Sequence, residues 1–123
     1  MRDLLLIGIG GGIGAVARYK LGGAILNTAV GWRFPLHTLV VNLLGCLAAG
    51  LLARLAERYS VVGPDLRLFL FTGLLGGFTT FSAFGLETVS LLQRQIPLVA
   101  VANVITSVLG ALFALWLGMK VVP

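Results

Sequence analysis

The sequence has few of the residues on which most catalytic and metal sites depend. It holds one cysteine, one histidine and four acidic residues among 123. A single cysteine excludes an intrachain disulfide framework and any zinc site built on paired cysteines. So few titratable groups leave no apparent nucleophile–base or carboxylate pair for an active site. We therefore expect that the protein is not an enzyme.

Charge is also scarce, and apolar residues take its place. Charged residues make up 11% of the chain and hydrophobic residues 59%. This composition excludes disorder, because so much apolar surface would not stay in water. The basic residues, nine against four acidic ones, lie beside apolar runs and do not cluster. We interpret them as anchors that face lipid phosphates rather than as a nucleic-acid surface, with attraction of small anions as a second interpretation.

Long uncharged stretches predict an all-α membrane protein with four transmembrane helices. A spanning helix needs about 20 apolar residues. The stretches cover residues 4–17 with a continuation at 21–26, then 34–53, 68–86 and 95–119. No linker or low-complexity tract separates them. We therefore expect residues 1–123 to form a single four-helix transmembrane domain.

The basic residues divide almost evenly between the two sides that these spans define. One side carries Arg2, Arg54, Arg58, Arg67 and Lys120, and the other carries Arg18, Lys20, Arg33 and Arg94. Because orientation follows the excess of Lys and Arg, this balance favours insertion in both orientations. Two opposed copies would then pair about a twofold axis in the membrane plane. The alternative is that Arg18 and Lys20 lie too deep to count, which restores a bias.

Glycines recur at helical spacing and predict close helix packing. The small-xxx-small pairs are Gly8 and Gly12, Gly10 and Gly14, Gly73 and Gly77, with Gly110, Ala114 and Gly118 in the fourth span. Such pairs let two backbones approach closely. Residues 10–15 also fit a dinucleotide-binding fingerprint, but that motif needs a preceding strand. The glycines therefore indicate a tight bundle or dimer and specify no function.

Polar side chains inside the spans are more informative, because they are costly in lipid and usually face protein or water. Thr38 and Asn42 share one face of the second span, and Asn103, Thr106 and Ser107 share one face of the fourth. Thr106 has an equal alternative, a hydrogen bond back to its own helix. The amides of Asn42 and Asn103 cannot be satisfied in that way, which favours a functional or interhelical role for both.

The third span contains the most distinctive run, residues 76–84, with the sequence GGFTTFSAF. Adjacent glycines weaken a helix, so we expect an unwound turn there, at mid-membrane. Backbone freed at that depth must be satisfied by protein, an ion or water. Freed carbonyls suit a hard cation, whereas amide and hydroxyl donors suit an anion. Phe81 and Phe84 share a face, and they either present positive ring edges to an anion or pack in the core.

The same run, followed by Glu87, resembles the G-G-x-T-T-F-S-x-F…E signature of the small fluoride channels of the Fluc/CrcB family. Residues 10–19, GGGIGAVARY, resemble the first helix of that family, with its arginine at Arg18. Residues 38–45, TLVVNLLG, resemble its T-L-x-x-N-x-x-G second helix. The three motifs occur in order and at matching spacing over the first three spans.

The resemblance implies an antiparallel, dual-topology homodimer in the cytoplasmic (inner) membrane of a prokaryote. Such a dimer exports cytoplasmic fluoride passively through pores at the subunit interface, which gives fluoride resistance. The residues that would line the pores are Asn42, Phe81, Phe84, Thr38, Ser107, Thr80 and Ser82. The resemblance also places Arg18 in an aqueous vestibule, Glu87 at the pore end, and a structural sodium ion on the backbone carbonyls of Gly76 and Thr79 from both copies.

Two positions depart from the family pattern. His37 stands where glycine is usual, which could change one vestibule or its response to pH, and Gly85 stands where serine is common.

The alternative function is a small proton-coupled multidrug exporter, which needs a titratable carboxylate deep in the membrane. Glu87 is the only candidate, and we expect it to close the third span. A scaffold subunit would explain the glycine pairs but not the polar and aromatic faces.

Overall fold

Helices occupy nearly the whole chain in the computed structural model, which describes residues 1–123. The elements are α1 (Arg2–Thr28), α2 (Leu36–Tyr59), α3 (Pro64–Arg67), the π-helix η1 (Leu68–Leu75), α4 (Gly76–Phe78), α5 (Phe81–Gln93) and α6 (Pro97–Val121). Elements α3 to α5 follow one another within a single span, Pro64–Gln93. With α1, α2 and α6 this makes four helices long and apolar enough to cross a membrane. The predicted all-α membrane class is confirmed.

The helices continue past the uncharged runs that predicted them. Helix α1 runs on through Arg18 and Lys20, α2 through Arg54, and α5 through Glu87. A charge ends an apolar run but not a helix, because Arg, Lys and Glu are good helix formers. The expectation that Glu87 closes the third span is therefore wrong, since α5 extends to Gln93.

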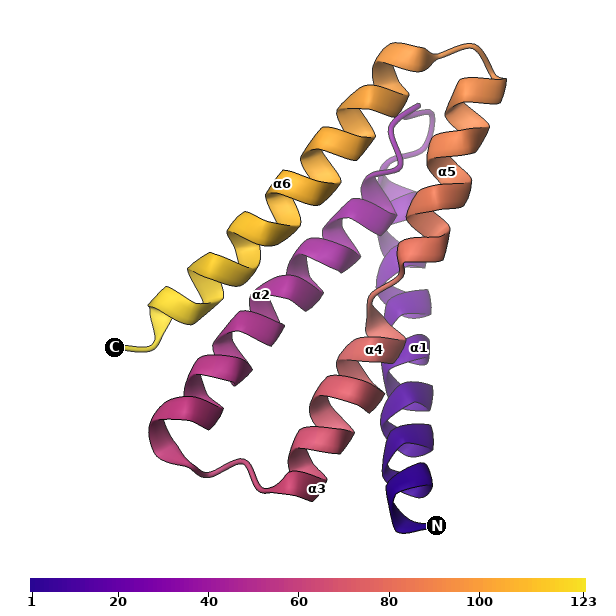
Figure 1. The fold of residues 1–123 in the computed structure, drawn as a ribbon. Coiled ribbons are helices and arrows are strands. Elements are labelled where there is room, and N and C mark those ends of the chain that lie inside the picture. Colours follow the sequence, from indigo (N-terminus) through magenta and orange to yellow (C-terminus); the bar gives the residue numbers. More distant parts are fainter.

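Two close helix pairs make up the bundle. Helix α2 packs along α6, while α1 packs along η1 and α4 (Figure 1). Helix α5 leaves the α1 side and contacts α6. The α1–α2 and α5–α6 connections lie at one end of the bundle, and the N-terminus and the α2–α3 connection lie at the other (Figure 1). The helices therefore run alternately up and down.

Some of the predicted glycine pairs lie where the backbones of two helices approach closely. A Cβ atom on Gly14 would overlap the carbonyl oxygen of Leu74, and one on Gly118 would overlap the α2 backbone. A Cβ on Gly10 or Gly77 would also overlap a neighbouring backbone, and one on Gly73 would make a tight contact with α1 at 3.1 Å. Gly8 and Gly12 differ, because a Cβ on either would meet nothing within 4 Å. Packing within the chain therefore accounts for the Gly10–Gly14 and Gly73–Gly77 pairs and not for Gly8–Gly12.

The third span changes its geometry along its length. After η1 and the short α4, the backbones of Thr79 (φ −84°, ψ 154°) and Thr80 (φ −148°, ψ 116°) are extended, and α5 begins at Phe81. Gly76 and Gly77 are themselves helical, so the expectation of an unwound turn at the paired glycines is wrong. Their part is close packing: a Cβ on Gly77 would overlap the backbone of Gly11 on α1.

Candidate functional site

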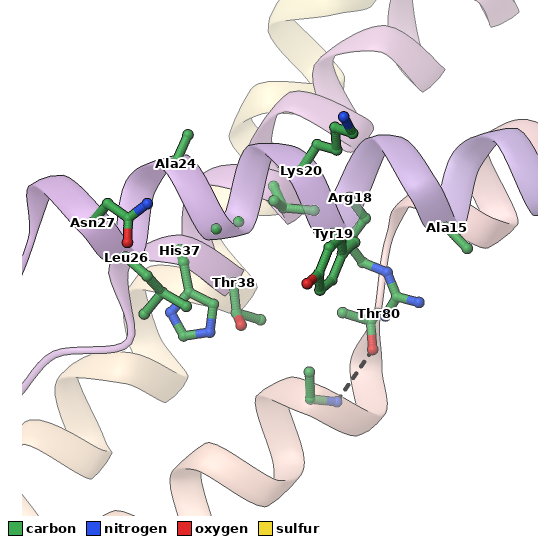
Figure 2. Close-up of a pocket in the computed structure, with 14 residues that line it drawn as sticks. Ala15, Arg18, Tyr19, Lys20, Ala24, Leu26, Asn27, His37, Thr38 and Thr80 are labelled. Carbon is green, nitrogen blue, oxygen red and sulfur yellow. Dashed lines mark hydrogen bonds between the residues drawn. The ribbon is translucent and has the colours of Figure 1, made fainter.

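The first of two cavities beside the extended residues lies between α1, α2 and α5. It has a volume of about 900 Å³ and is lined by residues that include Arg18, His37, Thr38 and Thr80. The guanidinium group of Arg18 reaches toward Thr80, whereas the Lys20 side chain points the other way (Figure 2). Arg18 is thus the one basic residue of α1 whose charge points into this cavity near Thr80.

The second cavity, of about 350 Å³, lies between α2, α5 and α6. Its lining includes Asn42, Phe81, Phe84 and Ser107, and no Lys, Arg, Asp or Glu. Thr80 lines both cavities. A track of uncharged donors and aromatic rings therefore continues from the cavity that holds Arg18.

The structure thus brings together most of the pore-lining residues predicted from the sequence. Asn42, Phe81, Phe84, Ser107 and Thr80 line the second cavity, and Thr38 lines the first with Thr80. Ser82 lines neither of these two cavities. Its hydroxyl lies on the exposed start of α5, 3.2 Å from the hydroxyl of Thr80.

Asn42 holds the extended residues in place. Its Oδ1 atom accepts a hydrogen bond from the Thr80 amide at 2.8 Å, and its Nδ2 atom donates to the Thr80 carbonyl at 3.0 Å. Thr80 caps α5 through its Oγ1 atom, which accepts from the Ala83 amide at 3.2 Å. A side chain of α2 therefore satisfies the backbone where the third span is interrupted, as the interhelical interpretation of Asn42 expected.

These same hydrogen bonds divert the helical donors of two carbonyl groups. In a continuous α-helix, the Thr80 amide would donate to the Gly76 carbonyl and the Ala83 amide to the Thr79 carbonyl. Here the Thr80 amide donates to Asn42 and the Ala83 amide to Thr80 Oγ1. Carbonyl oxygens are the kind of ligand that hard cations prefer. The carbonyl oxygens of Gly76 and Thr79 therefore suit a hard monovalent or divalent cation as ligands.

The two phenylalanines of the predicted site lie against each other. Their ring centroids are 5.3 Å apart with an interplanar angle of 47°. Phe84 is half-buried, but Phe81 is 81% exposed on the isolated chain. Core packing within the chain is therefore excluded for Phe81. Its exposed ring lies either against lipid or against another protein surface.

Glu87 forms a compact cluster with two neighbouring residues of α2. Its Oε1 atom accepts a hydrogen bond from Thr38 Oγ1 at 2.5 Å and lies 3.1 Å from His37 Nε2. Its Oε2 atom is buried without a hydrogen-bond partner. His37, one of the departures from the family pattern, thus lines the first cavity in contact with the only carboxylate near it. This pair could not be predicted from the sequence, because the two residues lie on different helices.

Asn103 and Thr88 form a further polar contact between helices. Asn103 is 1% exposed, and its Nδ2 atom donates to Thr88 Oγ1 at 3.0 Å. The buried role predicted for Asn103 is confirmed, but Thr88 was not among the predicted residues. The available signal was its spacing, because Thr88 is one turn after Phe84 and so faces the same side. Thr106 instead bonds back to the Ala102 carbonyl at 2.7 Å, which confirms the alternative considered for it.

Four membrane-length helices with polar cavities between them define a multi-pass membrane protein. The family described as "CrcB-like protein, Camphor Resistance (CrcB)" matches residues 5–119. The chain therefore belongs to the CrcB family, as the motifs indicated.

Curated relatives share nearly the full length of the chain. A protein of Methylobacillus flagellatus named "Fluoride-specific ion channel FluC" is 48% identical over 99% of this chain and 95% of its own length. A protein of the same name from Flavobacterium psychrophilum is 43% identical over 97% of this chain and 95% of its own. "Fluoride-specific ion channel FluC 1" of Methanosarcina acetivorans is 44% identical over 96% and 88%.

Proposed function

We propose that this protein is a fluoride-selective ion channel that lets cytoplasmic fluoride leave the cell passively and so gives fluoride resistance. Near-full-length relatives with that name support the proposal. The observation that carries it is the second cavity, which Asn42, Thr80, Ser107 and two phenylalanines line without a charged group. An ion channel changes no covalent bond, so we infer no enzymatic role.

Neutral donors suit the physical demands of fluoride transport. Fluoride is small and strongly hydrated, so a pore must replace its water with several donors at once. A fixed cation in the narrow part would hold the ion too firmly for it to leave. The amide of Asn42, the hydroxyls of Thr38, Thr80 and Ser107, and the ring edges of the phenylalanines meet this demand. Arg18, set back in the larger cavity, attracts anions to the entrance.

Glu87 lies on α5 and contacts Thr38 and His37 of α2, which line the first cavity. We infer that it marks the end of the pore on the side of that cavity. While Glu87 accepts the Thr38 hydroxyl, that hydroxyl is not free to bind an anion. The carboxylate therefore competes with fluoride for one donor at the pore end.

We further propose that the working unit is an antiparallel homodimer of dual topology. Phe81 is a proposed pore residue, yet it is 81% exposed on the single chain. A ring that contacts a permeating ion must be covered by protein, and a second copy is the simplest cover. The near-even division of basic residues supports insertion in both orientations. In this arrangement the interruption of the third span lies at mid-membrane.

A structural sodium ion fits the same arrangement. The carbonyl groups of Gly76 and Thr79 have their usual helical donors diverted to other acceptors. We infer that these carbonyls from both copies hold the ion. When bound, the ion supplies positive charge that neutralises the facing carbonyl dipoles and joins the subunits.

The proposed location is the cytoplasmic (inner) membrane of a prokaryotic cell, where a fluoride exporter must act. The four candidate spans support a multi-pass protein. Family membership supports the channel and not the proton-coupled multidrug exporter. The one deep carboxylate, Glu87, is already bonded to Thr38 and close to His37.

Growth in fluoride tests the proposed function and the role of Phe81 together. We expect this protein to restore growth of a fluoride-sensitive bacterium in medium with fluoride. Phe81→Ile should abolish the rescue, because isoleucine keeps the apolar bulk but has no ring edge for the anion. Growth is compared at equal membrane expression.

The matched control is Phe113→Ile. Phe113 is also exposed (60%) but lies on α6 against Trp116, outside both cavities. It should leave the rescue intact. Full rescue by Phe81→Ile would remove Phe81 from the pore, and no rescue by the unchanged protein would contradict the proposed function.

A further inference from the structure

A directed series of hydrogen bonds joins α6 to α5 behind the second cavity. Ser107 Oγ donates to Asn103 Oδ1 at 3.3 Å. Asn103 Nδ2 donates to Thr88 Oγ1 at 3.0 Å, and Thr88 Oγ1 donates to the Phe84 carbonyl at 2.7 Å. The first bond lies within α6 and the last within α5, so the Asn103–Thr88 bond is the one that joins the two helices.

The two ends of the series lie at the cavity and its middle does not. Ser107 and Phe84 line the second cavity, whereas Asn103 and Thr88 line neither cavity. Asn103 is 1% exposed. A buried amide is retained where its hydrogen bonds are satisfied, since an unpaired one is costly. The Oδ1 atom of Asn103 accepts from Ser107, which lines the proposed fluoride path. Its Nδ2 atom donates to Thr88, which is bonded to Phe84 on the same path.

We propose that Asn103 is a positioning residue that sets the selectivity of the pore. It fixes Phe84 through Thr88, and it directs the hydroxyl of Ser107. This inference rests on the proposed function, because selectivity has a meaning only if the protein conducts fluoride. Asn103 itself does not touch the permeating ion.

The series ties the turn of α5 that carries Phe84 to α6. Thr88 bonds back to the Phe84 carbonyl one turn earlier, and Asn103 anchors Thr88 to α6. The distance between the Phe84 ring on α5 and the Ser107 hydroxyl on α6 is thus fixed by one side chain between the helices. A narrow pore discriminates between halides by size only if its width is fixed.

The direction in which the Ser107 hydroxyl donates its hydrogen bond depends on Asn103. While no anion is present, its hydroxyl donates to Asn103 Oδ1, at a distance near the long end of the normal range. A bond of this length is readily exchanged for a stronger acceptor. Fluoride accepts hydrogen bonds more strongly than chloride does, so fluoride competes better for the Ser107 proton. After the ion leaves, the hydroxyl returns to Asn103.

Reversal potentials in planar lipid bilayers test this inference. With fluoride on one side and chloride on the other, the reversal potential reports the permeability ratio and not the number of working channels. A merely structural defect lowers the current without moving the potential. We expect Asn103→Leu and Thr88→Val to lower the fluoride-to-chloride ratio about tenfold, the effect of one ordinary hydrogen bond.

Two further variants serve as controls. Thr88→Ser keeps the hydroxyl and should keep the ratio of the unchanged protein. Thr106→Val removes a hydroxyl from the same face of α6, but that hydroxyl is exposed and bonds to its own helix. It should also leave the ratio unchanged.

The outcomes separate this inference from the proposed function. If the unchanged protein carries no fluoride current, the proposed function fails. If it is fluoride-selective and both Asn103→Leu and Thr88→Val keep its ratio, the positioning role is overturned. Should Asn103→Leu give no current, Thr88→Val decides alone. An equal shift in Thr106→Val would also overturn the inference, because the effect would then belong to α6 in general.

Discussion

Asn42 is the residue on which the geometry of the third span most depends. It supplies both the acceptor for the Thr80 amide and a donor for the Thr80 carbonyl, at 2.8 and 3.0 Å. Without it, two part-buried backbone groups would lose their partner. Each buried group left unsatisfied costs about 1–3 kcal/mol.

Asn42→Leu should therefore destabilise the protein by about 2 kcal/mol or more, since leucine has a similar volume but no polar atom. Unfolding in detergent with increasing denaturant measures the change. Asn27→Leu is the control, because Asn27 is exposed near the end of α1 and makes no comparable pair of bonds. Equal stability of the two variants would contradict the role of Asn42.

The sequence predicted single polar residues better than it predicted their partners. Asn42 and Asn103 were identified because an amide within a span cannot be satisfied by its own helix. The contacts of Glu87 with His37, and of Asn103 with Thr88, each join different helices. Periodicity places a residue on a face of its own helix, but it does not indicate which residue of another helix will be opposite.

Elements were predicted well where apolar length decides and less well where packing decides. The four spans follow from long apolar runs, and the structure contains all four. The interruption lies at Thr79 and Thr80 and not at the paired glycines. Its place is set by Asn42 on α2 and by the contact of Gly77 with Gly11 on α1. Both are contacts between segments far apart in the sequence.

Close packing of α1 on the third span gives a prediction at this scale. A Cβ atom on Gly14 would overlap the Leu74 carbonyl oxygen, and a backbone atom cannot move aside cheaply. Gly14→Val should therefore cost about 1–3 kcal/mol of stability or prevent folding, as overpacking does. Thermal unfolding in detergent measures the loss. Gly8→Val, six residues earlier on α1 with nothing within 4 Å of its Cβ, should change little; an equal loss in both variants would contradict the packing account.

The whole molecule combines a nearly even division of basic residues with an exposed Phe81, which we propose as a pore residue. Both features favour a second, opposed copy. We predict that a reporter fused to the C-terminus will be found on both sides of the membrane, because the excess of Lys and Arg on either side is too small to fix one orientation. Accessibility of the reporter in intact and opened cells measures this. Signal on a single side would contradict dual insertion and leave the exposure of Phe81 to be explained by lipid or another partner.

Fluoride efflux from liposomes tests the central claim most directly. Purified protein is reconstituted into vesicles loaded with potassium fluoride, and a potassium ionophore is added to balance the charge. The account predicts rapid fluoride release as soon as the ionophore is present, with no pH gradient, and far slower release of chloride. Release no faster than from protein-free vesicles, or release that requires a proton gradient, would contradict it.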